Sequence, residues 1–148
     1  MRCGVQPEIA FRRWLLPSLV LACGVSTIAV GQHRVGTWNI AQLRGDYTAI
    51  ADVLAEGSAD DSRGFAVPVA VWVFQEVDTD NLEDIHDLLG SQYTQGTYTS
   101  SNEDLYSGAQ AMFYHSSIVT EITSGHDDIY TGAGRRSDRW QIRLLGYD

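Results

Sequence analysis

Residues 69–74 form the strongest hydrophobic feature of the chain after its first 31 residues. All six are apolar, which is typical of a strand that is buried on both faces of a sheet. The pattern turns polar at Gln75 and Glu76, where we expect this strand to end. Ligands bind at the carboxyl ends of strands in open α/β sheets, so Glu76 is a candidate site residue.

Weaker patterns on either side predict further strands and two helices. The expected strands are residues 34–40, 92–97, 109–114, 118–123 and 140–145. One helix is capped by Asp46 and ends near Gly57. The other is capped by Asp78 or Thr79 and ends at Gly90. Strands and helices in this alternating order predict an α/β fold.

Three polar stretches carry no periodicity and are expected to be loops. They are residues 58–64, 100–108 and 124–138. The last of these holds His126 and the pair Asp127-Asp128, which we interpret as loop residues.

The first 31 residues are expected to be an export signal, and residues 32–148 the mature domain. Two adjacent arginines precede an apolar run that is interrupted by proline and glycine and falls short of the ~20 apolar residues of a membrane-spanning helix. We therefore expect no stable membrane span and an exported protein, periplasmic or extracellular. The arginine pair resembles a twin-arginine signal. Alternatively, residues 20–23 resemble a lipoprotein processing site, with a lipid anchor at Cys23.

Cysteine content and charge limit the possible chemistry. Cys3 and Cys23 are the only cysteines, and both precede the mature domain, so a disulfide, a zinc–thiolate site and a cysteine nucleophile are disfavoured there. The chain has 19 acidic residues, ten arginines and no lysine. Residues 1–31 hold one of these acids and three of these arginines, which leaves the domain a formal charge of −11. An anionic substrate would need local arginines or bound cations.

Two strand ends together suggest a binding site. Asn39 closes the first expected strand as Glu76 closes the next, so both side chains would face one crevice if these strands are neighbours. The carboxylate would hold a hard divalent cation, and the amide would bond a phosphate oxygen or orient a second carboxylate. Taken singly, Glu76 is also explained as an acid before a helix, and Asn39 as a turn residue.

These segments resemble a known family. Val35-Gly-Thr-Trp-Asn-Ile40 and Val73-Phe-Gln-Glu-Val77, then Gly108-Ala-Gln-Ala-Met-Phe-Tyr114 and a late Arg-Trp-Gln-Ile-Arg-Leu, are similar to the N-terminal half of the endonuclease/exonuclease/phosphatase family, which has the DNase I-like fold. The resemblance implies the N-terminal part of a two-sheet α/β sandwich, incomplete here. It also implies cleavage of phosphate esters with Mg²⁺, or with another divalent cation such as Mn²⁺ or Ca²⁺.

The resemblance assigns roles residue by residue. Glu76 would be a metal ligand, and Asn39 an active-site amide beside the metal. Tyr106 and Arg139 would contact the phosphate, with Arg135 and Arg136 as rivals of Arg139. The implied substrate is a phosphate ester: a nucleic acid, a nucleotide, or a phospholipid or inositol head group.

The sequence also departs from the family. The family's Asp-x-Asn segment, catalytic histidine and closing Asp-His pair belong to its C-terminal half and are not found here; His115 and His126 do not match that histidine. We therefore expect a metal-dependent phosphoric ester hydrolase in a longer parent protein, of which this fragment alone is inactive. The alternative is an exported non-catalytic module that binds a cation or a partner, with Asp60-Asp61 and Asp127-Asp128 as cation loops. A serine hydrolase is disfavoured because no Gly-x-Ser-x-Gly occurs.

Overall fold

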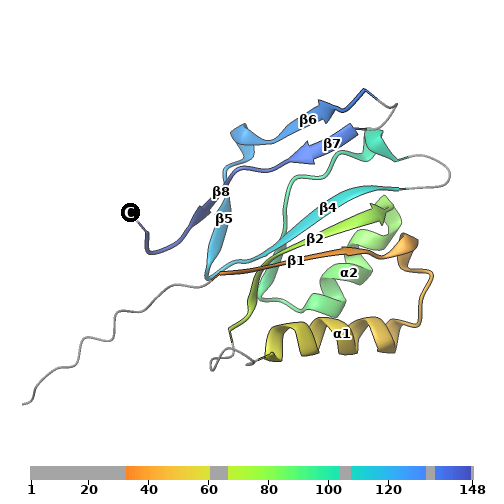
Figure 1. Cartoon of the computed structure of the whole chain (residues 1–148), viewed down its shortest axis with the longest axis vertical. Helices are drawn as coiled ribbons and strands as arrows, with labels where there is room; N and C mark the ends of the chain where they lie inside the picture. Colours follow the sequence, from red (N-terminus) through yellow and green to blue (C-terminus); the bar gives the residue numbers. More distant parts are fainter. Residues whose placement is uncertain (1–32, 61–66, 104–107, 133–135, 148) are drawn as a thin grey trace, which may run out of the picture. The chain divides into compact units, whose positions relative to one another are not determined.

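The computed structural model describes residues 33–60, 67–103, 108–132 and 136–147 (Figure 1). The expected export signal with Cys3 and Cys23 lies outside the described residues, as do Tyr106 and Arg135. The chain divides into two units, residues 1–30 and 31–148, and the second is described below. No helix in the described part of the chain is long and apolar enough to cross a membrane.

The described residues form a mixed α/β fold, as the alternating pattern predicts. The elements are β1 (Arg34–Asn39), η1 (Ala41–Leu43), α1 (Tyr47–Ala59), β2 (Val69–Val77), η2 (Thr79–Asn81), α2 (Leu82–Leu89), β3 (Tyr93–Gln95), η3 (Ser100–Asn102), β4 (Ala109–His115), β5 (Val119–Glu121), η4 (Thr123–Gly125), β6 (Asp127–Tyr130), β7 (Arg136–Arg139) and β8 (Ile142–Leu144). A four-stranded sheet has the order β1-β2-β4-β3, and two-stranded sheets pair β5 with β8 and β6 with β7. In the larger sheet β1 runs parallel to β2, while β4 is antiparallel to both of its neighbours.

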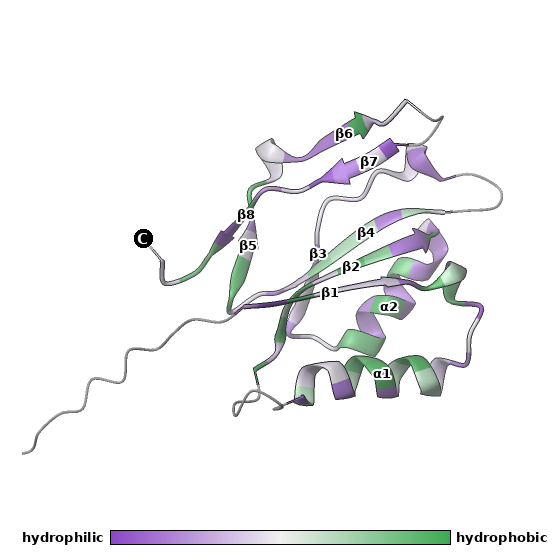
Figure 2. Ribbon diagram, in the orientation of Figure 1, coloured by the Kyte–Doolittle hydropathy of each residue, from purple (hydrophilic) through white to green (hydrophobic). Residues whose placement is uncertain are grey.

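Strand β2 lies inside the four-stranded sheet and is covered on both faces, as its apolar run predicts. On one face Trp72 and Phe74 pack with Phe113 and with buried residues of both helices. On the other face Val71 packs with Met112 and with side chains from β5 and β8. Figure 2 shows this hydrophobic centre as green segments of β2 and β4. The buried strand therefore holds its own carboxyl end in a fixed place.

The helix ends follow local chemistry. Asp46 caps α1, because its Oδ1 accepts hydrogen bonds from the amides of Thr48 at 2.8 Å and Ala49 at 3.2 Å. Helix α1 continues to Ala59, past the expected end at Gly57; a Cβ at Gly57 would lie 3.2 Å from the Trp72 ring, so this glycine serves close packing inside the helix. Helix α2 ends at Gly90, which has φ +87°, as predicted.

The prediction that residues 124–138 form a loop is wrong, because strand β6 and most of strand β7 lie in this range. Figure 2 shows both strands as largely hydrophilic, so they lack the apolar alternation that predicts a strand. Their pairing places Arg139 opposite Asp127, 3.2 Å away, and Arg136, which is opposite Tyr130, reaches diagonally to Asp128 at 2.7 Å. Asp127 and Asp128 are therefore strand residues rather than loop residues.

Three expected strands are shorter in the structure. Residues 92–97 contain β3, residues 118–123 contain β5, and residues 140–145 contain β8. The expected tight turn after β4 is present, with the amide of Ile118 donating to the carbonyl of His115 at 2.9 Å. It leads the chain into a second sheet, where β5 pairs with β8.

Candidate functional site

Asn39 and Glu76 meet at the carboxyl ends of two neighbouring parallel strands. Asn39 is the last residue of β1 and is paired with Gln75 of β2, and both strands end at the same edge of the sheet (Figure 1). The Asn39 Nδ2 donates a hydrogen bond to the Glu76 Oε1 at 2.9 Å. The Asn39 Oδ1 accepts from the Ala41 amide at 3.0 Å. Asn39 therefore orients the carboxylate and holds the following turn with one side chain.

Glu76 occupies a bulge in β2. The pairing with β4 shifts register between Gln75 and Val77, and Glu76 has φ +58°, a left-handed conformation that costs a non-glycine residue on the order of 1–3 kcal/mol. The extra residue lets Val77, which is fully buried, join Phe74 in the core under the helices. Glu76 is thereby displaced to the half-buried rim of the sheet. Its Oε2 makes no hydrogen bond within the described residues.

Backbone strain gathers at this edge. Ala41, Gln42 and Leu43 have φ of +46°, +57° and +52°, and with Glu76 they are all the non-glycine residues of positive φ in the described part of the chain. Leu43 is buried, and the Ile40 amide bonds the Gln75 carbonyl at 3.2 Å, so the turn is anchored to β2. Such strain persists only where the surroundings enforce it, and it concentrates at functional sites.

The arginines implied as phosphate contacts are engaged elsewhere. Arg139 pairs with Asp127, and both side chains are more than half exposed; Arg136 pairs with Asp128. Among the described residues, no hydrogen bond or ion pair brings either arginine to Asn39 or Glu76. Arg44 follows the strained turn, is exposed, donates to the Gln42 side chain and makes no ion pair within the described ranges. Sequence reasoning missed Arg44, because its position depends on the turn.

The alternative cation loops are also charge-paired. Asp60 lies 3.5 Å from Arg34, and the carboxylates of Asp127 and Asp128 face arginines on β7; Asp61 lies outside the described residues. No group of three or more His, Cys, Asp or Glu residues that could hold a metal occurs in the described part of the chain. A cation at Glu76 would therefore rely on one carboxylate, water and substrate oxygens, a donor set that fits Mg²⁺.

Tyr98 and Glu103 support the same edge and carried no sequence signal. The Tyr98 hydroxyl lies 2.7 Å from the Val77 carbonyl and 2.8 Å from the Glu103 Oε1. The Thr79 amide donates to the same carboxylate oxygen at 3.0 Å. Burial, and then the bond to Glu103, raise the pKa of Tyr98 well above its ordinary value. The hydroxyl therefore stays protonated beside the residue that follows Glu76.

The two histidines that do not match the family have structural partners. His115 ends β4, and its Nδ1 lies 3.0 Å from the Ser117 hydroxyl. The Nε2 of His126 lies 3.2 Å from the Oδ1 of Asp138, a buried carboxylate that also accepts from the Thr99 hydroxyl at 2.7 Å. Through Asp138 of β7, His126 is linked to the loop that holds Thr99. It is therefore not a free loop residue.

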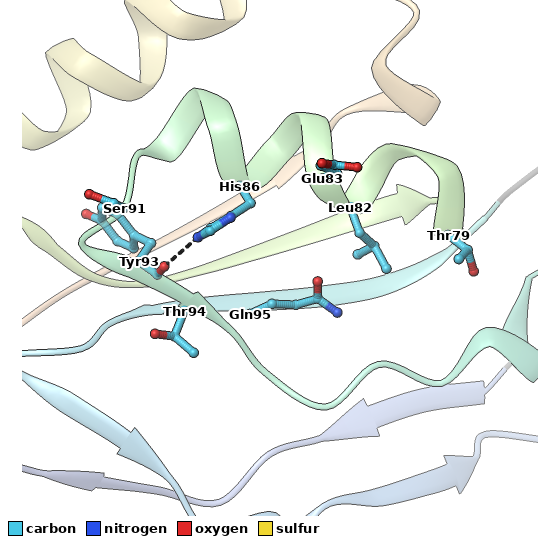
Figure 3. Close-up of a pocket in the computed structure, with 8 residues that line it drawn as sticks. All are labelled: Thr79, Leu82, Glu83, His86, Ser91, Tyr93, Thr94 and Gln95. Atoms are coloured by element: carbon cyan, nitrogen blue, oxygen red, sulfur yellow. Dashed lines mark hydrogen bonds between the residues drawn. The ribbon is translucent and has the colours of Figure 1, made fainter.

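A separate groove of about 660 Å³ lies between α2 and β3 (Figure 3). It is lined by Thr79, Leu82, Glu83, His86, Ser91, Tyr93, Thr94 and Gln95. The His86 Nε2 lies 2.9 Å from the Tyr93 carbonyl, so the ring covers a backbone oxygen of the edge strand. The groove contains neither Asn39 nor Glu76 and is distinct from their edge.

No protein-family model matches the chain, and no curated protein sequence matches it. The family resemblance therefore rests on the segments quoted above and on the residues within them.

Proposed function

We propose that the edge formed by Asn39 and Glu76 is the cation-binding part of a metal-dependent phosphoric ester hydrolase of the endonuclease/exonuclease/phosphatase type. The observation that carries this proposal is the 2.9 Å hydrogen bond between Asn39 Nδ2 and Glu76 Oε1. The strand-end pattern and the resemblance both point to these two residues, which lie 37 positions apart in the sequence. Their contact at adjacent strand ends is what a shared site requires.

Each residue has a distinct part in this proposal. Glu76 would hold Mg²⁺, or Mn²⁺ or Ca²⁺, through Oε2, while Asn39 fixes the carboxylate through Oε1. A bound cation would polarise a phosphoryl oxygen and offset its charge. Arg44 supplies a positive charge next to the turn, which matters because the chain carries a formal charge of −9. The substrate would be a phosphate ester met outside the cytoplasm.

The two-sheet sandwich belongs to the same proposal. Val119 of β5 and the half-buried Leu144 of β8 pack on the face of the larger sheet opposite the helices. This arrangement supports a second layer over β2 and β4. Val35 of β1 lies in a strand whose alternate residues are exposed, and it is 68% exposed. We propose that this outer part of the face is the remainder of the sandwich interface.

A non-catalytic cation-binding module is the second candidate function. It is favoured by one observation: no hydrogen bond or ion pair joins a second carboxylate or an imidazole to Glu76 in the described ranges. Hydrolysis also needs a group that activates water. We therefore expect the 148-residue chain to bind a cation without measurable phosphodiester or phosphomonoester hydrolysis; turnover that Glu76→Gln abolishes would contradict this expectation.

The proposal is tested by titrating the ¹⁵N-labelled chain with Mn²⁺, which broadens nearby NMR signals. We expect selective broadening of the Asn39 side-chain amide and of backbone amides near Glu76. Glu76→Gln should abolish it, while Glu56→Gln, at an exposed glutamate of α1, should leave it unchanged. Broadening that survives Glu76→Gln, or that spreads evenly over acidic residues, would contradict the proposal.

A further inference from the structure

Gly108 lies against the backbone of the Glu76 bulge. It precedes β4 and has φ +52°. A Cβ built on Gly108 would lie 2.6 Å from the Glu76 carbonyl carbon, 2.7 Å from the Val77 nitrogen and 2.8 Å from the Val77 oxygen. All three are backbone atoms, so no side-chain rotation relieves the overlap. Glycine is required here by close approach as well as by φ.

This contact occurs at the peptide that sets the direction of Glu76. Val77 pairs with Ala109, the residue after Gly108, at the register shift of the bulge. The Tyr98 hydroxyl bonds the Val77 carbonyl at 2.7 Å, so the next peptide, between Val77 and Asp78, is held as well. A side chain at position 108 would move the first of these peptides and, with it, the carboxylate that Asn39 holds.

We propose that Gly108 is a positioning residue for the Glu76 carboxylate. Its missing side chain lets the peptide between Glu76 and Val77 sit where Glu76 reaches Asn39, and its effect on cation affinity rests on the function proposed above. Gly132 offers a matched comparison, because it has φ +87° and, its chain neighbours apart, no atom of the described residues lies within 4 Å of a Cβ built on it. Alanine at position 132 introduces left-handed strain alone, whereas alanine at position 108 adds the overlap.

The test compares Gly108→Ala with Gly132→Ala by NMR in the full chain. In metal-free protein, Gly108→Ala should shift the Asn39 side-chain amide signals, because the bond to Glu76 is lost, and Gly132→Ala should leave them in place. With Mn²⁺, Gly108→Ala should weaken binding at least tenfold relative to Gly132→Ala. Unchanged Asn39 signals together with equal Mn²⁺ affinities would overturn the assignment.

The two readouts separate this inference from the proposed function. If the unmodified chain does not bind Mn²⁺ but Gly108→Ala displaces the Asn39 amide, the cation proposal fails and the positioning role stands. If Mn²⁺ binds near Glu76 and Gly108→Ala changes neither readout, the positioning role fails alone.

A folding control covers the case in which Gly108→Ala does not fold. Adding Glu76→Gly gives the bulge backbone freedom to adjust, so the double variant should fold where the single variant does not. A double variant that also fails to fold would overturn the coupling between positions 108 and 76.

Discussion

The edge at Asn39 and Glu76 and the hairpin of β6 and β7 use charge in opposite ways. In the hairpin, Arg136 and Arg139 each face a carboxylate on the neighbouring strand. At the edge, the Glu76 carboxylate is held by a neutral amide and its backbone is left-handed. A paired charge on relaxed backbone is explained by the fold alone. A carboxylate on strained backbone, with one oxygen unbonded among the described residues, is the observation that motivates the cation proposal.

The largest expected effect concerns Asn39. Asn39→Ala removes the donor to Glu76 and the acceptor for the Ala41 amide, which should lower the free energy of unfolding by about 2–3 kcal/mol. It should also weaken Mn²⁺ binding, because the carboxylate is no longer oriented. Denaturant unfolding and Mn²⁺ titration measure the two effects. Asn81→Ala, which removes only a long 3.4 Å bond to the Asp78 amide, is the control, and equal effects in both variants would contradict the role of Asn39.

Asp138 should matter for stability alone. Asp138→Ala leaves Thr99 and His126 without their buried acceptor and should cost about 2 kcal/mol in denaturant unfolding. Because Asp138 makes no hydrogen bond or ion pair with Asn39 or Glu76 in the described ranges, Mn²⁺ broadening should not change. A loss of Mn²⁺ binding would show that the two regions are coupled.

Alkaline pH should weaken the support from Tyr98. The pKa of Tyr98 is raised in the folded state, so the folded chain holds this proton more tightly than the unfolded chain does. The stability from this difference is fully present below about pH 10 and is lost as pH rises further. Tyr98→Phe should therefore flatten the alkaline decline of the melting temperature, and Tyr130→Phe, at an exposed tyrosine, should not. An identical decline in both variants would exclude this role.

The smallest effect is expected in the hairpin. Arg139→Gln breaks an ion pair whose side chains are 60% and 57% exposed, so it should change the unfolding free energy by less than about 1 kcal/mol. It should not alter Mn²⁺ binding at Glu76. A clear loss of phosphate binding in this variant would restore Arg139 as a phosphate contact.

Much of the scaffold was predictable, because it follows from local patterns. The apolar run of β2, the Asp46 cap and the glycine after α2 each leave a physical signature in the sequence. The pairing of Asn39 with Glu76 was predictable on one condition, that their strands are neighbours, and the structure meets it. Helix α1 extends past its expected end at Gly57. This glycine packs against Trp72, a tertiary contact, and does not end the helix.

The remaining features arise from contacts that no local pattern encodes. Ion pairs join strands β6 and β7 across the hairpin. Their residues are therefore polar, and the sequence pattern predicted a loop there. The bulge at Glu76 depends on the space that Gly108 leaves, from a segment more than thirty residues later in the chain. The positions of Tyr98 and Arg44 likewise depend on the folded structure of the edge at Asn39 and Glu76.

The central claim is that Glu76 keeps a strained conformation for the sake of a ligand, and Glu76→Gly tests it most directly. Glycine adopts φ +58° without penalty, whereas Glu76→Ala loses the same bond to Asn39 and keeps the strain. Relative to Glu76→Ala, thermal or denaturant unfolding of Glu76→Gly should therefore show a gain of about 1 kcal/mol, while Mn²⁺ binding at the Asn39 edge is lost. A Glu76→Gly variant that is both less stable than Glu76→Ala and still able to bind Mn²⁺ there would contradict the claim.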